Sequence, residues 1–381
     1  MEQRVRFVAA IAEAEESRSE SFAAVCRRFG VSRRVGYKWV ERFRAGGVDG
    51  LKDKPRAPHH CPHKTPDEVR DALIELRKEF SNWGPRKLRD VLLTRRPDLH
   101  VPRASAIGTM LKNAGLIHPP RRRVHTPPSL VPLEPGERPN DVWCVDFKGH
   151  FALGDKTRCY PLTITDHVTR YLLKCEGLLQ PREAPVRVHF ERVFREFGMP
   201  LRIRSDNGPP FASTGLGGLS ALNVWWMKLG ITHERIEPGK PQQNGRHERM
   251  HRTLKAEALP QATIAEQQRV FDSFRGRYND VRPHDALDGK TPSSRYYASP
   301  RPMPERLRSP EYPDAMKVRR LDSHGSLCFG GKPFAFCSVL AGEPVGLELV
   351  EEDTWEVFYG SILLAEVRVR ARRDVLIRRV A

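Results

Sequence analysis

The chain has 381 residues, of which 29% are charged and 39% hydrophobic, and its formal net charge is +18. This length is too great for one small hydrophobic core and favours two to four domains. No apolar run of 18 residues predicts a membrane-spanning helix, and seven cysteines without a CxxC pair argue against a disulfide framework.

The positive charge is concentrated toward the N-terminus. Residues 1–140 carry 28 Lys and Arg against 17 Asp and Glu, whereas residues 301–381 carry 13 against 12. A polyanion such as DNA is the expected ligand, although a ribosomal or RNA-binding protein would show the same bias. The reduced thiols and the absence of a signal-peptide cleavage pattern predict a cytoplasmic protein.

Residues 1–50 have the pattern of a helix-turn-helix DNA-binding domain. Apolar spacing predicts a helix over 21–30 after a first helix near 5–14, and Ser32 can cap a third helix. The apolar face of that helix comprises Val35, Gly36, Trp39, Val40 and Phe43. Near its basic start, Arg33, Arg34 and Lys38 are candidates for contacts in the major groove. The alternative is a helical hairpin with a solvated basic face.

Residues 51–64 form a Pro-rich basic linker. Its His59, His60, Cys61 and His63 raise the question of a zinc site, but a closed structural site uses two ligand pairs and no second pair follows. We therefore do not predict zinc.

Residues 65–117 predict a second helix-turn-helix or winged-helix DNA-binding domain. Thr65 and Glu68 match a capping box at the start of its first helix, and further helices are expected near 85–95 and 103–114. Arg86 and Lys87 are its candidate DNA contacts. Residues 118–140 then form a Pro/Arg-rich linker in which Arg121, Arg122 and Arg123 can follow a phosphate backbone.

Residues 141–298 predict an α/β catalytic core. Strands are expected near 141–149, 159–166, 171–178, 201–205 and 231–236, with helices near 185–197 and 219–229 between the later strands. Three antiparallel strands followed by alternating helices and strands give a mixed five-stranded sheet with helices on both faces.

Three acids in the core stand in unusual surroundings. Asp146 lies in the apolar run VWCVDF, Asp206 follows the strand LRIRS and opens a turn, and Glu248 lies among basic residues on a helix. A lone buried carboxylate costs several kcal/mol unless a partner or a metal compensates it. The three acids therefore suggest one divalent-metal site. Asp166 is a competing ligand candidate, although TDHVTR is typical of a hairpin turn.

Residues 299–313 form a linker, and residues 314–381 show short alternating runs separated by glycines. This pattern predicts a small C-terminal β-barrel, followed by a basic tail.

The segments SDNGPPF, PGKPQQNGRHERMHRTLK and YNDVRPHDAL, in this order after Asp146, resemble the catalytic core of DDE transposases with a retroviral-integrase fold. The most similar group is the bacterial insertion sequence 481 family. The chain departs from many integrase-like cores in one respect, because 41 residues rather than about 35 separate Asp206 from Glu248. We expect the excess to form an enlarged loop before the helix that ends near Leu229.

This resemblance implies a ribonuclease-H-like core that binds transposon ends, cleaves DNA and joins the 3′-OH to target DNA. Two Mg²⁺ ions about 3.5–4 Å apart, with Mn²⁺ as a substitute, are the expected cofactors. Asp146 would bind both ions, and Asp206 and Glu248 one each. The helix that carries Glu248 offers further DNA-binding candidates, namely Asn244, Arg246, His247, Arg252 and Lys255.

The expected partners are double-stranded DNA, both as transposon ends and as target, and further copies of the chain in a dimer or larger assembly. The site of action would be the bacterial nucleoid, and no membrane partner is expected. Two alternatives stay open: a non-catalytic DNA-binding regulator with an inactive core, and a ribonuclease-H-like nuclease without joining activity.

Overall fold

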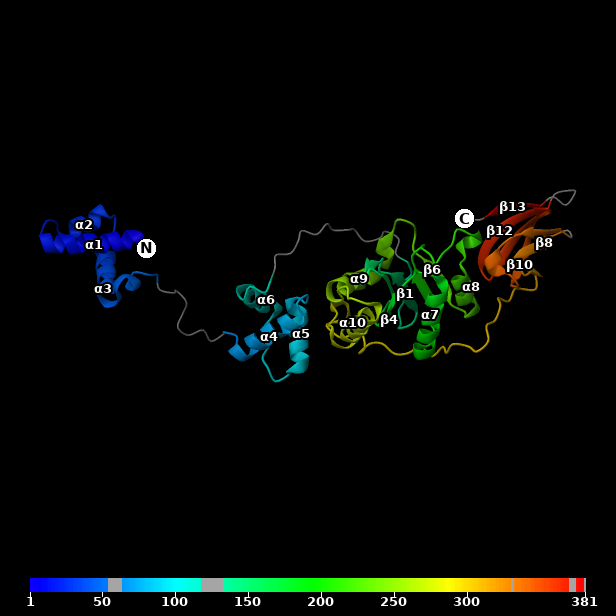
Figure 1. The fold of residues 1–381 in the computed structure, drawn as a ribbon, viewed down its shortest axis with the longest axis horizontal. Helices are drawn as coiled ribbons and strands as arrows, with labels where there is room; N and C mark the ends of the chain where they lie inside the picture. The colour runs from blue at the N-terminus through cyan, green and yellow to red at the C-terminus, as the bar shows by residue number, and fades with distance from the viewer. Residues whose placement is uncertain (54–63, 118–132, 330–331, 370–374, 380–381) are drawn as a thin grey trace. The chain divides into compact units, whose positions relative to one another are not determined.

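The computed structural model describes residues 1–53, 64–117, 133–329, 332–369 and 375–379 (Figure 1). The chain divides into two compact units, Met1–Lys64 and Thr65–Ala381. Within the described ranges, no helix combines the length and apolar character needed to cross a membrane.

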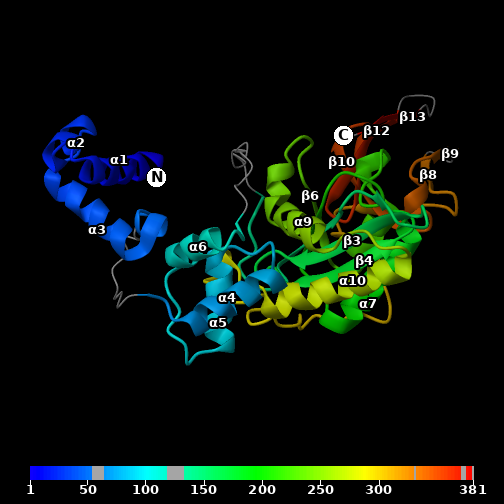
Figure 2. The same ribbon diagram turned by 60° about the vertical axis from the view of Figure 1, so that its left-hand side comes forward.

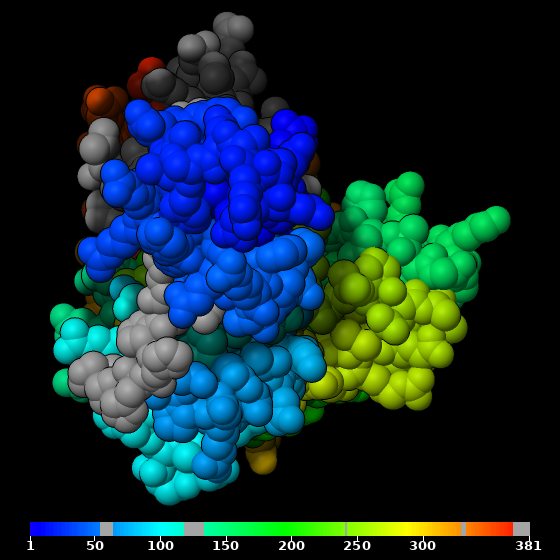
Figure 3. Space-filling view, turned by 90° about the vertical axis from the view of Figure 1, so that its left-hand side faces the viewer, coloured from blue at the N-terminus to red at the C-terminus, as the bar shows by residue number. Residues whose placement is uncertain are grey.

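The first unit is a three-helix bundle, drawn in blue in Figures 2 and 3, with α1 (Glu2–Ser17), α2 (Phe22–Arg28) and α3 (Arg33–Gly50). The Ser32 hydroxyl accepts a hydrogen bond from the Val35 N–H at 3.4 Å, which confirms Ser32 as the cap of α3. A Cβ on Gly36 would lie 2.8 Å from Cys26 Sγ, so a glycine permits close helix packing there. Val35 and Phe43 are 38% and 36% exposed, so their predicted place on the buried face is wrong.

The second unit begins with three helices, α4 (Asp67–Glu79), α5 (Pro85–Arg95) and α6 (Ala104–Asn113). The predicted capping box is wrong, because Pro66 is the N-cap of α4 and no side chain caps this helix. Glu68 instead forms an ion pair with Arg96 at 2.8 Å. The helices predicted near 85–95 and 103–114 are confirmed, and leucines and valines from all three helices share one apolar cluster.

A mixed sheet forms the middle of the second unit. Its strands are β1 (Val142–Phe147), β2 (Phe151–Ala152), β3 (Arg158–Asp166), β4 (Leu172–Leu178), β5 (Arg202–Ser205) and β6 (Thr232–Arg235). Strand β1 lies between β3, to which it is antiparallel, and β5, to which it is parallel. Strand β4 pairs with β3 and β6 pairs with β5. The five longer strands match the prediction, and the two-residue β2 is an unpredicted sixth strand on the start of β3.

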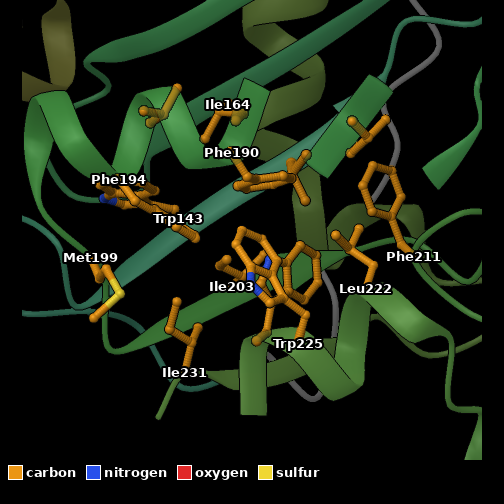
Figure 4. Packing of buried hydrophobic residues seen from close by; sticks show 14 of the residues in the cluster. Trp143, Ile164, Phe190, Phe194, Met199, Ile203, Phe211, Leu222, Trp225 and Ile231 are labelled. Carbon is orange, nitrogen blue, oxygen red and sulfur yellow. The ribbon is translucent and has the colours of Figure 1, made fainter. Parts of the chain in front are cut away.

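Helices cover both faces of this sheet. The longer helices are α7 (Glu183–Phe197), α8 (Ala221–Lys228), α9 (Gly245–Glu257) and α10 (Ile264–Gly276). Phe190 and Phe194 of α7 and Trp225 of α8 pack with Trp143 and Ile203 of the sheet (Figure 4). A separate cluster joins apolar residues of α9 and α10 to the other side of β3 and β4. The Trp225 and Trp226 rings are both buried in the core.

The C-terminal part contains a five-stranded antiparallel sheet, in the order β13-β12-β11-β10-β7, and a separate β8–β9 hairpin. The strands are β7 (Lys317–Arg320), β8 (Ser326–Phe329), β9 (Lys332–Ala335), β10 (Pro344–Glu351), β11 (Thr354–Tyr359), β12 (Ile362–Val369) and β13 (Val375–Arg379). The predicted barrel is not confirmed, because the described strands form an open sheet with β7 and β13 at its edges. Part of the predicted basic tail forms β13.

Short helical turns connect the larger elements: η1 (Leu216–Gly218), η2 (Pro241–Asn244), η3 (Arg277–Val281), η4 (Asp285–Leu287) and η5 (Ser338–Leu340). The turn η1 lies in the segment that lengthens the spacing between Asp206 and Glu248. Leu216, Leu219 and Val224 share an apolar cluster with the C-terminal sheet, and Lys228 Nζ lies 2.6 Å from Glu343 Oε1. The extra residues therefore seat the C-terminal sheet on the core.

Candidate active site

Asp146 lies at the end of β1, opposite Thr163 of the antiparallel strand β3. Its side chain is only 22% exposed. The pKa of Asp146 is raised to about 7, mainly by burial and also by the charges of Asp206 and Glu248. A carboxyl group with acidic neighbours and little water favours a proton or a cation beside it.

Asp206 reaches the same end of the sheet as Asp146 through the parallel pairing of β1 with β5. Cys144 pairs with Arg204 in this register, and each aspartate follows its paired residue by two positions. Burial raises the pKa of Asp206, while the Gly208 N–H donates to Oδ1 at 3.2 Å and lowers it. A Cβ on Gly208 would lie 3.1 Å from Asp206 Oδ2, so glycine leaves the carboxylate accessible.

Glu248 lies in the first turn of α9 and its side chain is exposed. Its charge reaches Asp146, because it is one of the causes of the raised pKa of that carboxyl. Among the residues that the structure describes, no three His, Cys, Asp or Glu side chains stand close enough together to hold a metal ion. The three acids are therefore coupled by charge without forming a preassembled ligand cluster.

The buried face of α9 is polar where it meets β3. His247 and His251 are 1% and 3% exposed and both bond to Thr163, while His247 also bonds to Thr165. Burial lowers the pKa of His247 to about 3 and lowers that of His251 strongly, so both rings are neutral at pH 7. The structure gives no support to the predicted DNA contact of His247, because its ring is buried and hydrogen-bonded to the sheet.

Fewer of the predicted DNA-binding residues of α9 are exposed than expected. Glu248, Arg252 and Lys255 are exposed, as is Arg246 at the start of the helix, where Nη1 donates to the His167 carbonyl at 3.2 Å. Asn244, in contrast, is 4% exposed, and its Oδ1 has no hydrogen-bond partner in the described residues. Its predicted position on the DNA-facing side is wrong, because the turn η2 directs it inward.

The far end of α9 is fixed by contacts with the α4–α6 helices. Trp83 Nε1 donates to Glu257 Oε1 at 3.1 Å, and Arg282 forms an ion pair with the same carboxylate at 2.6 Å. Lys87 Nζ donates to the Pro283 carbonyl at 2.8 Å, and burial lowers the pKa of Lys87 to about 8. The structure gives no support to the predicted DNA contact of Lys87, because its ammonium group bonds to the core.

Asp166 serves the turn between β3 and β4. Its carboxylate accepts hydrogen bonds from the Asn140 N–H at 2.8 Å, the Thr169 N–H at 2.7 Å and the Thr169 hydroxyl at 2.6 Å. These donors compensate the cost of its burial, and the hairpin-turn interpretation is favoured over a metal ligand.

The remaining candidate DNA contacts fall into two groups. The side chains of Arg33, Arg34 and Lys38 on α3 and of Arg86 on α5 are exposed. Arg121, Arg122 and Arg123 lie outside the described residues, as do the histidines and cysteine weighed as zinc ligands.

Sequence reasoning missed the partners of α9 on the sheet. The signals for them were the spacing of His247 and His251 by one helical turn and of Thr163 and Thr165 by two strand positions, each of which places a pair on one face. Nothing in the sequence said that these two faces meet. The contact of Trp83 with Glu257 joins residues 174 positions apart and had no local signal either.

Comparison with protein families finds models described as an integrase core domain on residues 136–241 and 229–292. A homeodomain-like domain model matches residues 35–111, and a helix-turn-helix domain model matches residues 3–59. The two integrase-core matches overlap on residues 229–241, which lie between Asp206 and Glu248.

Two curated relatives come from bacterial insertion elements. The uncharacterized 31.7 kDa protein of insertion element IS407 from Burkholderia multivorans is 31% identical over 234 residues, which cover 58% of this chain and 78% of that protein. The 39.2 kDa protein of IS476 from Xanthomonas euvesicatoria is 28% identical over 288 residues, covering 74% and 80%. Among solved structures, the HTLV-2 integrase catalytic core in complex with magnesium is 18% identical, with a TM-score of 0.34 over 42% of this chain and 99% of that one.

Proposed function

The chain belongs to the integrase-core transposases of insertion elements, which are polynucleotidyl transferases, and we propose that it cuts DNA at the ends of such an element and joins them to target DNA. In this proposal the terminal inverted repeats are bound by the helix-turn-helix domains. The insertion sequence 481 family stays a prediction, since the relatives named above come from the elements IS407 and IS476.

One observation carries the catalytic proposal. The parallel register of β1 and β5 puts Asp146 beside Asp206, and the raised pKa of Asp146 records the charges of both Asp206 and Glu248. Mutual repulsion of neighbouring carboxylates is relieved when a divalent cation binds between them. A structural role alone gives no reason to gather three acids at one end of the sheet.

The chemistry of these side chains fits Mg²⁺, which prefers carboxylate oxygens. Asp146 would hold both of two ions, and Asp206 and Glu248 one each, with Mn²⁺ as a substitute. When bound, the ions supply activation of the attacking oxygen and stabilisation of the leaving oxygen in an in-line displacement at phosphorus.

The chain's own residues position the DNA. Gly208 keeps the space beside Asp206 open, so a phosphodiester can approach the acids. Arg252 and Lys255 extend from the exposed face of α9 beyond Glu248, where their charges attract phosphates on either side of the scissile bond. Arg33, Arg34 and Lys38 would contact the repeats in the major groove.

Both ends of an element must be cut and joined together, so the active assembly would hold at least two copies of the chain on DNA. A protein with this activity acts on the bacterial nucleoid in the cytoplasm. The two alternatives named from the sequence, a non-catalytic regulator and a nuclease without joining activity, predict different products from the same substrate.

The test uses labelled duplexes that carry the ends of the chain's own element, a target plasmid and Mg²⁺. We expect a covalent joint product from the wild-type chain, and none from Asp206→Asn, which should bind the ends with unchanged affinity. Cut ends without a joint product would support the nuclease, and bound but uncut ends would support the regulator. Asp166→Asn is the matched control, since it neutralises a buried aspartate outside the three acids.

A further inference from the structure

A network of four uncharged side chains fastens α9 to β3 directly beneath the candidate active site. Thr163 and Thr165 lie two positions apart on β3, and His247 and His251 lie one turn apart on α9. The two imidazole rings meet edge to face with centroids 4.6 Å apart. We call this set the histidine–threonine clasp.

Hydrogen-bond accounting fixes the direction of the bonds at Thr163. Its hydroxyl donates to the Asp146 carbonyl at 3.1 Å and lies 2.8 Å from His247 Nε2 and 2.7 Å from His251 Nε2. A hydroxyl has one proton and two lone pairs, and a carbonyl oxygen can only accept. Both Nε2 atoms therefore donate to Thr163.

The second threonine bonds to the other ring nitrogen of His247. The Thr165 hydroxyl lies 2.7 Å from His247 Nδ1 and can donate to this atom or accept from it. The Thr163 hydroxyl and both ring nitrogens of His247 are thus satisfied. Satisfied buried networks hold one arrangement, because any shift leaves a polar group unpaired in a dry environment.

The clasp joins the two elements that carry the acids. Thr163 is opposite Asp146 in the β1–β3 register and bonds to its backbone, while Glu248 lies between the two histidines on α9. The Nδ1 atom of His251 lies 3.6 Å from Asp146 Oδ2, which is too far for a hydrogen bond. A sliding or rolling movement of α9 over the sheet would break bonds to Thr163.

We propose that the histidine–threonine clasp sets the position of Glu248 relative to Asp146. Its members are positioning residues, since they would act through the acids without touching DNA. The inference rests on the proposed function, because it assigns the clasp to that active site. The partners of ligating groups commonly change metal affinity or activity by about 10- to 100-fold when they are removed.

The decisive variant is Thr163→Val, which preserves shape and removes the hydroxyl. We expect the calorimetric affinity for Mg²⁺ alone to fall about 10- to 100-fold, and the Mg²⁺ concentration for half-maximal joining to rise in parallel. Thr163→Ser restores the hydroxyl and should stay within about threefold of wild type on the same scale. Affinity for element ends should not change.

Thr169→Val is the matched control. Thr169 is also buried and its hydroxyl bonds to a buried aspartate, so its loss destabilises the fold to a similar degree away from the clasp. Its Mg²⁺ affinity should equal that of wild type. Equal Mg²⁺ affinities for Thr163→Val and Thr169→Val would overturn the proposal.

His251→Leu keeps the test decisive if Thr163→Val does not fold. Leucine keeps an apolar side chain in the buried position and removes the Nε2 donor to Thr163. We expect reduced Mg²⁺ affinity, and unchanged affinity would overturn the proposal. A wild-type chain that joins no DNA defeats the proposed function, whereas the order of Mg²⁺ affinities still decides the clasp.

Discussion

The ends of β1 and β3 carry a partly buried aspartate, Asp146, and a buried one, Asp166, and the two carboxylates differ in what surrounds them. Asp166 receives three hydrogen bonds from Asn140 and Thr169, which hold the turn between β3 and β4. Asp146 faces the charges of Asp206 and Glu248 instead. Burial raises the pKa of both carboxyl groups, but hydrogen-bond donors offset part of the rise at Asp166, whereas acidic neighbours add to it at Asp146.

Burial alone therefore does not identify a functional carboxylate. A buried acid whose donors are all supplied by its own turn is part of the architecture. An acid that is shielded from water among other acids is destabilised by burial and by charge repulsion. A bound cation can offset both effects. The following predictions test this distinction.

The largest effect is expected from Asp146→Asn. The joining rate should fall by a factor on the order of 10³ or more, because the site loses a charge at the reacting phosphate. The free energy of unfolding should stay the same or increase, because a repelling buried charge is removed. Joining assays and urea denaturation measure the two quantities. Full strand transfer by this variant would remove Asp146 from the metal site.

Asp166→Ala should reverse this pattern. The substitution leaves the Asn140 N–H, the Thr169 N–H and the Thr169 hydroxyl without their acceptor, and we expect a loss of about 3 kcal/mol in stability. Joining per folded molecule should remain close to wild type. A stable Asp166→Ala protein that fails to join DNA would show that the comparison assigns the two aspartates wrongly.

The pH dependence of stability should separate wild type from Asp146→Asn in the absence of divalent metal. The pKa of Asp146 is raised from 3.8 to about 7 in the fold. The contribution of its protonated form is therefore fully present below about pH 4 and is lost as pH rises toward 7. Relative to the variant, wild type should lose stability across this window and level off above it. A constant difference between pH 4 and pH 8 would contradict the raised pKa.

The smallest effects are expected from substituting two lysines, the exposed Lys255 and Lys87, whose ammonium group bonds to the core. Lys255 is exposed on α9, so Lys255→Ala should weaken DNA binding a few-fold and reduce the salt dependence by about one phosphate contact. Lys87 bonds to the Pro283 carbonyl, so Lys87→Ala should lower stability without changing that salt dependence. Filter binding at several salt concentrations distinguishes them. Identical salt slopes for both variants would mean that burial does not separate their roles.

The local pattern of the chain determined most of its elements. Apolar and β-branched runs specified the five longer strands of the core sheet, and helical spacing specified α2, α5 and α7, because each depends on neighbours within one or two turns. The setting of Asp146 in an apolar run also placed it correctly in a core strand, where its side chain is partly buried. The interpretation of Glu248 as an acid of the same site needed the longer motif around it.

Tertiary structure alone decided which side chains were already engaged. His247 and Lys87 look like DNA contacts in the sequence. Only the packing of α9 on β3 and of α5 on the core showed that both side chains bond to other parts of the chain. Likewise the C-terminal strands alternate as a barrel would, but closure depends on whether β7 meets β13. Periodicity along the chain fixes the face on which a residue lies, whereas its partner is set by long-range packing between segments that local spacing does not relate.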